Sequence, residues 1–164
     1  MEKIHVPHLL KLTHQQARLE VDQFITDFAS LTPVRGWLQV KHRGNFLEVF
    51  TKVEAIVTLD CDRCLQQYNY KLQVNHQEIL LLEDTDPEEQ PLELELESED
   101  LVDTISPTGH FDPQNWIYEQ LCLALPSKQL CSATCQGIAV VDNPDDETID
   151  RRWGALEILK KQLF

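Results

Sequence analysis

Residues 47–65 read LEVFTKVEAIVTLDCDRCL, and this stretch decides the fold that the sequence predicts. From position 47 to 59 the odd-numbered residues are apolar apart from one threonine, while the even-numbered residues include two glutamates, a lysine and a second threonine. Successive side chains of a β-strand point to opposite faces, so this alternation predicts a strand with one buried face. The even-numbered residues from 68 to 74 are again apolar or aromatic. The pattern therefore predicts two antiparallel strands that join at the cysteines.

Two cysteines, Cys61 and Cys64, lie where these strands meet. Continuing each alternation outward puts both sulfurs on the same, apolar side of the hairpin. The residues between them, Asp62 and Arg63, include neither Gly nor Asn, which a tight two-residue turn favours because its central residues need positive φ angles. We therefore expect something else to hold the turn, and a metal ion bound by the cysteines would do so.

The rest of the chain predicts an α+β fold: an antiparallel sheet of about five strands, two C-terminal helices and a cysteine knuckle. Leucine and glutamate alternate over 92–97, which predicts a strand with an acidic outer face. Asp112 followed by Pro113 predicts the start of a helix over 113–125, and a second helix is expected over 151–164. We expect a single domain over 1–164, with an N-terminal arm (1–33), a β region (34–105) containing an acidic loop (83–91), and a helical region (106–164).

The charge of the chain is concentrated in its middle. The formal net charge is -14, and fourteen acids but no Lys or Arg lie between Leu72 and Ser127. Such asymmetry favours an interaction surface or a solvated loop. No purely apolar run exceeds five residues, which is too short to cross a bilayer, and the N-terminal residues do not resemble a signal peptide. We therefore expect an acidic cytoplasmic protein with no membrane partner, whose cysteines are thiols or ligands rather than disulfides.

Four of the five cysteines form two short pairs, Cys61-x2-Cys64 and Cys131-x3-Cys135. Two close pairs from distant segments are the usual arrangement of a structural zinc site, because each turn supplies two sulfurs to a tetrahedral ion. Two alternatives stay open: reduced, partly buried thiols without a ligand, or a redox pair within CDRC. A strand rather than a helix is predicted after CDRC, which counts against the redox pair. We expect the fifth cysteine, Cys122, to be a small core residue of its helix.

Three segments together resemble the YceD family of large ribosomal RNA subunit accumulation proteins. They are VTLDCDRCL (57–65), FDPQNWIYEQLCLALPSKQLC (111–131) and DRRWGALEIL (150–159). The resemblance implies a cytoplasmic factor that is needed for large-subunit rRNA to accumulate. It aligns the two cysteine pairs of this chain with those of the family. Many members have further cysteines after the position of Cys135, and their absence here leaves these four as the only candidate ligand set.

The predicted partner is large-subunit rRNA or a basic ribosomal protein. Direct RNA contact needs Lys and Arg to neutralise phosphates, and a net charge of -14 opposes it except at local basic patches. No aromatic strip of the kind found in RNA-recognition motifs is visible in the sequence. A basic ribosomal protein would instead be held by charge complementarity, although acids on an edge strand also protect it from pairing. The candidate contact residues are Lys41, Arg43, Arg151 and Arg152 for RNA, and Glu93, Glu95 and Glu97 for a basic protein.

No pattern in the sequence indicates catalysis. We find no catalytic triad order, no phosphate loop and no paired carboxylates in an apolar setting. The sequence and the resemblance together predict a non-catalytic ribosome-assembly factor with a structural zinc site and no small-molecule substrate. The alternative is a thiol redox or zinc-sensing protein that uses the CDRC pair.

Overall fold

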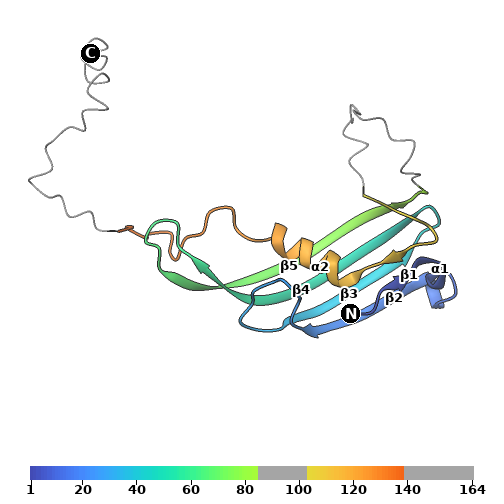
Figure 1. Ribbon diagram of the computed structural model, residues 1–164, viewed down its shortest axis with the longest axis horizontal. Helices are drawn as coiled ribbons and strands as arrows, with labels where there is room; N and C mark the ends of the chain where they lie inside the picture. The colour runs from blue at the N-terminus through green and yellow to red at the C-terminus, as the bar shows by residue number, and fades with distance from the viewer. Residues whose placement is uncertain (85–102, 139–164) are drawn as a thin grey trace, which may run out of the picture.

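The computed structural model describes residues 1–84 and 103–138 (Figure 1). A five-stranded sheet in the order β2-β3-β4-β5-β6 forms most of the molecule, and a two-stranded sheet pairs β1 with β7. Strands β2 to β5 are consecutive antiparallel neighbours, whereas β6 pairs parallel with the end of β5. The strands are β1 (Ile4–His5), β2 (Gln16–Gln23), β3 (Val34–His42), β4 (Phe46–Asp60), β5 (Gln67–Leu82), β6 (Thr104–Ile105) and β7 (His110–Phe111). The helices are α1 (Val6–Leu9), the 3-10 turn η1 (Thr13–Gln15) and α2 (Pro113–Leu123).

The α+β class and a mostly antiparallel sheet of five strands are confirmed. Strand β4 alternates as its sequence predicts, with buried side chains at every odd position from 47 to 59, and Cys61, directly after the strand, is also buried. It pairs with β5 along its whole length, from Phe46 opposite Leu81 to Asp60 opposite Gln67. This long pairing buries a continuous apolar face, which the hydrophobic effect favours over any register shifted by one residue.

The N-terminal segment differs from the expected arm. Strand β2 forms the sheet edge and pairs with β3 over eight residues, from Gln16 opposite Lys41 to Gln23 opposite Val34. Val6 and Leu9 of α1 are fully buried in the core. The segment therefore belongs to the folded sheet, because its apolar residues complete the core that β3 leaves open. The single-domain organisation of the whole chain stays a prediction.

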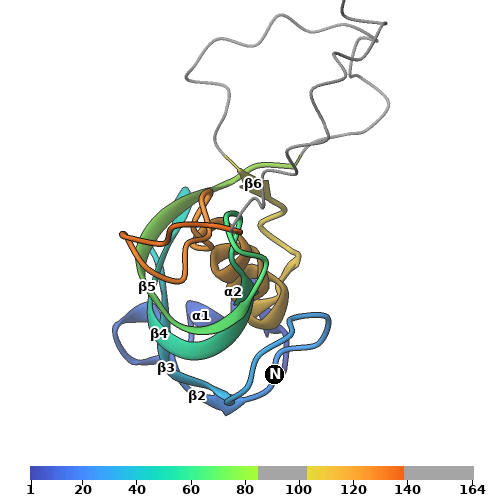
Figure 2. The ribbon, with the colours of Figure 1, turned by 90° about the vertical axis from the view of Figure 1, so that its left-hand side faces the viewer.

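Helix α2 lies against the concave inner face of the sheet, which curves around it (Figure 2). Trp116, Ile117 and Leu121 of the helix are buried in the core. Trp116 Nε1 donates a hydrogen bond of 2.5 Å to Glu78 Oε2 of β5, and Gln120 Nε2 donates one of 3.2 Å to the same oxygen. The helix predicted over 113–125 is thereby confirmed, two residues shorter at its end.

Cys122 is exposed rather than a core residue. Helical residues are separated by about 100° around the axis, so the inward direction of Leu121 turns Cys122 toward solvent.

The second predicted helix, over 151–164, and the acidic strand over 92–97 lie outside the described residues, as does the loop 83–91 beyond Asp84.

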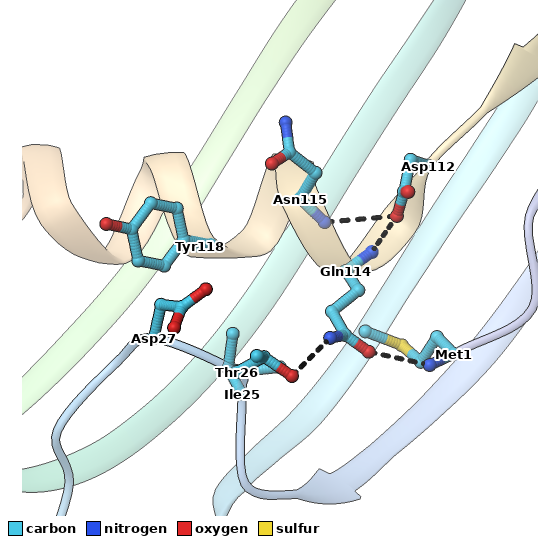
Figure 3. Close-up of a pocket in the computed structure, with 8 residues that line it drawn as sticks. All are labelled: Met1, Ile25, Thr26, Asp27, Asp112, Gln114, Asn115 and Tyr118. Atoms are coloured by element: carbon cyan, nitrogen blue, oxygen red, sulfur yellow. Dashed lines mark hydrogen bonds between the residues drawn. The ribbon is translucent and has the colours of Figure 1, made fainter.

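The start of α2 is capped as the sequence predicts (Figure 3). Asp112 Oδ1 accepts hydrogen bonds of 3.1 Å from the backbone N–H groups of Gln114 and Asn115. The Gln114 side chain also joins the N-terminus to this region, because its Oε1 accepts a 2.8 Å hydrogen bond from the Met1 ammonium. Partial burial raises the pKa of Asp112, but the N–H of Asn115 and the ammonium of Lys3, 3.2 Å away, outweigh it and hold this pKa below its usual value.

We expect Asp112→Ala to lower the free energy of unfolding by about 1 kcal/mol at neutral pH, because two helix N–H groups lose their acceptor. Since the folded-state pKa of Asp112 is depressed, this contribution is present above the unfolded pKa and is lost as the pH falls through the folded pKa. Thermal unfolding of wild type and variant at pH 7 and in acid measures it, with exposed Glu2→Ala as control. A difference in Tm that persists undiminished in acid contradicts the expectation.

Candidate metal centre

The loop that carries the first cysteine pair is held by backbone hydrogen bonds of its own. β4 ends at Asp60 and β5 begins at Gln67, so six residues connect them. Cys61 N–H donates to the Gln66 carbonyl at 3.0 Å, and Leu65 N–H donates to the Cys61 carbonyl at 2.8 Å. Leu65 supplies the left-handed conformation, with a φ of 59°. As the lack of Gly and Asn between the cysteines indicates, the connection is not a tight two-residue turn but a six-residue loop, which leaves room for two inward-facing sulfurs.

The segment after α2 returns to this hairpin and docks on it (Figure 1). Asp62 and Gln129 exchange two hydrogen bonds: Asp62 N–H donates to the Gln129 carbonyl at 2.8 Å, and Gln129 N–H donates to Asp62 Oδ2 at 2.7 Å. Arg63 Nη1 donates to the Cys135 carbonyl at 2.9 Å. Gly137, with a φ of 81°, lies so close that a Cβ there would be 3.3 Å from the Arg63 carbonyl oxygen. Thus Asp62 and Arg63, between the first two cysteines, position the loop that carries the other two.

Docking brings all four predicted cysteines together. The Sγ atoms of Cys61, Cys64, Cys131 and Cys135 all lie within 4.8 Å of one another. Sγ of Cys61 is 3.8 Å from that of Cys135, and Sγ of Cys64 is 3.7 Å from that of Cys131. Cys61 is fully buried, whereas the other three are partly or largely exposed. We call this set the four-cysteine cluster; it could hold one metal ion.

The electrostatics of the cluster favour a cation. Hydrogen bonds from the backbone N–H groups of Cys131 and Cys64 lower the pKa of the Cys61 thiol to about 6. Interactions with the thiols of Cys135, Cys61 and Cys64 raise the pKa of Cys131 to about 12. One negative charge is therefore stabilised, and further ionisation is opposed by repulsion between the sulfurs. Four thiolates at these distances require a positive ion between them, which is the chemistry of a metal site.

The predicted RNA-contact residues in the described part of the chain lie at the other end of β4. Lys41 is near the end of β3, and Arg43 follows in the turn to β4, where its Nη2 lies 2.9 Å from Glu48 Oε2. The remaining predicted contacts, Arg151, Arg152, Glu93, Glu95 and Glu97, lie outside the described residues. The structure therefore brings the four cysteines together and keeps Lys41 and Arg43 away from them.

These features define an α+β protein in which a long antiparallel hairpin and a remote loop meet at a four-cysteine cluster. The family model described as "Large ribosomal RNA subunit accumulation protein YceD" matches residues 49–160. The match includes most of β4 and both cysteine pairs and covers more than half of the chain. The chain therefore belongs to the YceD family, which confirms the resemblance seen in its sequence.

Comparison with curated proteins and with solved structures gave no match. Within residues 1–84 and 103–138, no helix has the length and apolar character needed to cross a membrane.

Proposed function

We propose that this protein is a non-catalytic ribosome-assembly factor that supports the accumulation of large-subunit rRNA in the cytoplasm. The observation that carries this proposal is membership of the YceD family, whose description names large ribosomal RNA subunit accumulation. The fold is compatible with a scaffold, because the long β4–β5 hairpin and the docked loop present extended surfaces at fixed positions. The partner is either large-subunit rRNA or a basic ribosomal protein.

The metal we propose for the four-cysteine cluster is zinc, in a structural role. A tetrahedral ion with zinc–sulfur bonds of about 2.3 Å has sulfur–sulfur edges of about 3.8 Å. The two sulfur separations of 3.8 and 3.7 Å agree with this value. Zinc also favours four-thiolate sets, and four protein ligands leave no open position for a substrate. Bound there, zinc would supply a cross-link between the hairpin and the loop.

The alternative of a redox pair within CDRC has less support. A low-pKa redox thiolate is typically stabilised by a helix N-terminus, whereas CDRC leads into strand β5. In addition, Cys131 and Cys135 lie as close to the first pair as a shared ligand set requires. A switch confined to Cys61 and Cys64 would give the second pair no role.

The proposed function is tested by complementation. Cells that lack this protein should show a reduced ratio of large-subunit to small-subunit rRNA, and expression of the wild-type chain should restore the ratio. Quantification of both rRNAs by northern blot measures the effect. A normal ratio in cells without the protein, with no deficit in assembled large subunits, would overturn the proposal.

A further inference from the structure

The convex outer face of the sheet carries aromatic side chains where a solvated face would carry polar ones. Trp37 of β3 and Phe50 of β4 lie diagonally across the strand pair, with ring centroids 5.1 Å apart and planes inclined by 53°. The guanidinium of Arg18, from β2, stands 4.2 Å from the centroid of the Trp37 ring. Both rings are only half-buried. Residues from three strands thus build a cation–aromatic platform on the face opposite α2.

Two hollows lie beside this platform and share Trp37 as a wall. The smaller, of about 290 Å³, extends toward Lys41 and is lined by Gln39, Phe50 and Gln77. The larger, of about 580 Å³, extends toward Lys52 and Arg35. Its floor is formed partly by Gly36, where any Cβ would collide with the backbone oxygen of Lys52. We call the two hollows and the platform together the outer groove.

The charge of the outer groove is locally positive although the chain is acidic. Its acids are already engaged: Glu48 pairs with Arg43 at 2.9 Å, and Glu54 pairs with Lys71 at 3.0 Å. Among the described residues, Lys41 and Lys52 form no ion pair within 4.0 Å, so their ammonium groups remain available to an anionic ligand. They lie on opposite sides of the aromatic pair, one in each hollow.

Amide side chains supply the remaining polar groups of the outer groove. Gln39 and Gln77 line the smaller hollow, and Gln73 and Asn75 line the larger. The side-chain amides of Gln39, Gln73 and Gln77 each already donate one hydrogen bond to a neighbouring side chain. A primary amide also has a second N–H and a carbonyl oxygen, with which it can pair with the edges of an exposed base. Volumes of about 300 to 1,000 Å³ are usual for ligand-binding hollows.

We propose that the outer groove binds single-stranded RNA, with a base stacked on the Trp37–Phe50 platform and phosphates near Lys41 and Lys52. The proposal deepens the proposed function and rests on it for the choice of RNA as the ligand. It identifies a contact surface that includes Lys41, one of the RNA-contact residues predicted from the sequence, and not the acidic strand predicted over 92–97. Stacking aromatics flanked by cations are the chemistry by which sheets recognise unpaired bases. A basic protein fits this surface less well, because the unpaired charges of the outer groove are positive.

The test uses the full chain and a fluorescein-labelled single-stranded RNA of about 12 nucleotides, within the usual site size of such surfaces. Fluorescence anisotropy gives the dissociation constant as a function of salt. We expect the double variant Trp37→Leu, Phe50→Leu to bind at least about tenfold more weakly, since each stacked base loses its platform. The double variant Lys41→Gln, Lys52→Gln should lower the slope of log K against log salt by about 1.4, the value for two phosphate contacts on a single strand.

The matched control is Lys11→Gln, Lys128→Gln, which removes two exposed lysines that do not line the outer groove and should leave affinity and slope unchanged. The lysine variants keep the inference testable if the aromatic variant fails to fold. An unchanged slope in Lys41→Gln, Lys52→Gln overturns the proposal, as does equal affinity for duplex RNA of the same sequence. Absence of RNA binding at low salt, while a basic ribosomal protein binds, overturns it as well.

The rRNA measurement in complemented cells separates this inference from the proposed function. If outer-groove variants restore large-subunit rRNA as fully as the wild type does, the outer groove is not the RNA contact in cells. The proposed function is untouched by that result. Failure of the wild-type chain itself to restore the rRNA would overturn the proposed function, and the anisotropy result would still decide whether the outer groove binds RNA.

Discussion

Cys61→Ser is expected to abolish stoichiometric zinc binding and to cause the largest loss of stability of any single ligand substitution. Cys61 is the fully buried member of the four-cysteine cluster, and its thiol has the lowered pKa that favours the first metal–thiolate bond. An ion present at 1,000 times its dissociation constant stabilises the fold by about 4 kcal/mol. For a chain of this size the Tm should fall by roughly 8 to 16 °C. The loop around Gln129 should also exchange its amide hydrogens faster, since only polar contacts would then hold it.

Elemental analysis of protein purified without chelator, followed by thermal unfolding, measures both parts of this expectation. Cys122→Ser is the matched control, because Cys122 is an exposed cysteine outside the cluster and should change neither zinc content nor Tm. A wild-type protein free of zinc, with a reversible disulfide between Cys61 and Cys64, would contradict the structural site and favour the redox alternative. Zinc retained at one ion per chain in Cys61→Ser would contradict the role of this thiol.

Trp116→Ala is expected to destabilise the protein by about 3 to 5 kcal/mol, the usual cost of removing a buried aromatic side chain. Trp116 is 5% exposed and packs between α2 and β5, where its ring also lies near Phe111 and His76. Its indole N–H donates to Glu78, so the substitution also removes a hydrogen bond from a carboxylate on the inner face of the sheet. α2 should lose its main attachment to the sheet, and the loop that carries Cys131 should lose its anchor in turn.

Urea unfolding followed by circular dichroism measures this loss as a lower midpoint. Trp116→Phe separates the two contributions, because it retains most of the packing and removes only the N–H donor, and it should cost less than the alanine variant. Glu119→Ala, at an exposed position of the same helix, serves as control and should lie within about 0.5 kcal/mol of wild type. A midpoint for Trp116→Ala equal to that of the control would show that α2 does not depend on this contact.

Strand β4 links the two candidate sites. Fifteen extended residues span about 50 Å, so the four-cysteine cluster at one end of β4 is well separated from the turn with Arg43 at the other. The odd-numbered residues of β4 build the core and Cys61 follows directly after the strand, while its even-numbered residues Phe50 and Lys52 belong to the outer groove. One alternating strand therefore supplies part of the core and of the proposed RNA contact, and it positions a ligand of the proposed zinc site at its end.

Local patterns in the sequence were sufficient for several of these features. The alternation over 47–59 predicted β4, and Asp112 with Pro113 predicted the start of α2, because strand periodicity and helix capping depend on neighbouring residues alone. The spacing of the four cysteines predicted that they would meet, since few arrangements other than a shared ion bring two short pairs together. Even the shared direction of Cys61 and Cys64 followed from counting along two strands.

Other features depend on contacts between distant segments, and only the tertiary structure decided them. The place of β2 at the sheet edge and the parallel pairing of β6 with β5 depend on which strands meet. The exposure of Cys122 depends on which face of α2 meets the sheet. Trp37 and Phe50 are thirteen positions apart in sequence, and they become a platform only through the register that sets Trp37 opposite Lys52. Register is chosen by the total burial of both strands, a sum over many residue pairs that no short stretch of sequence contains.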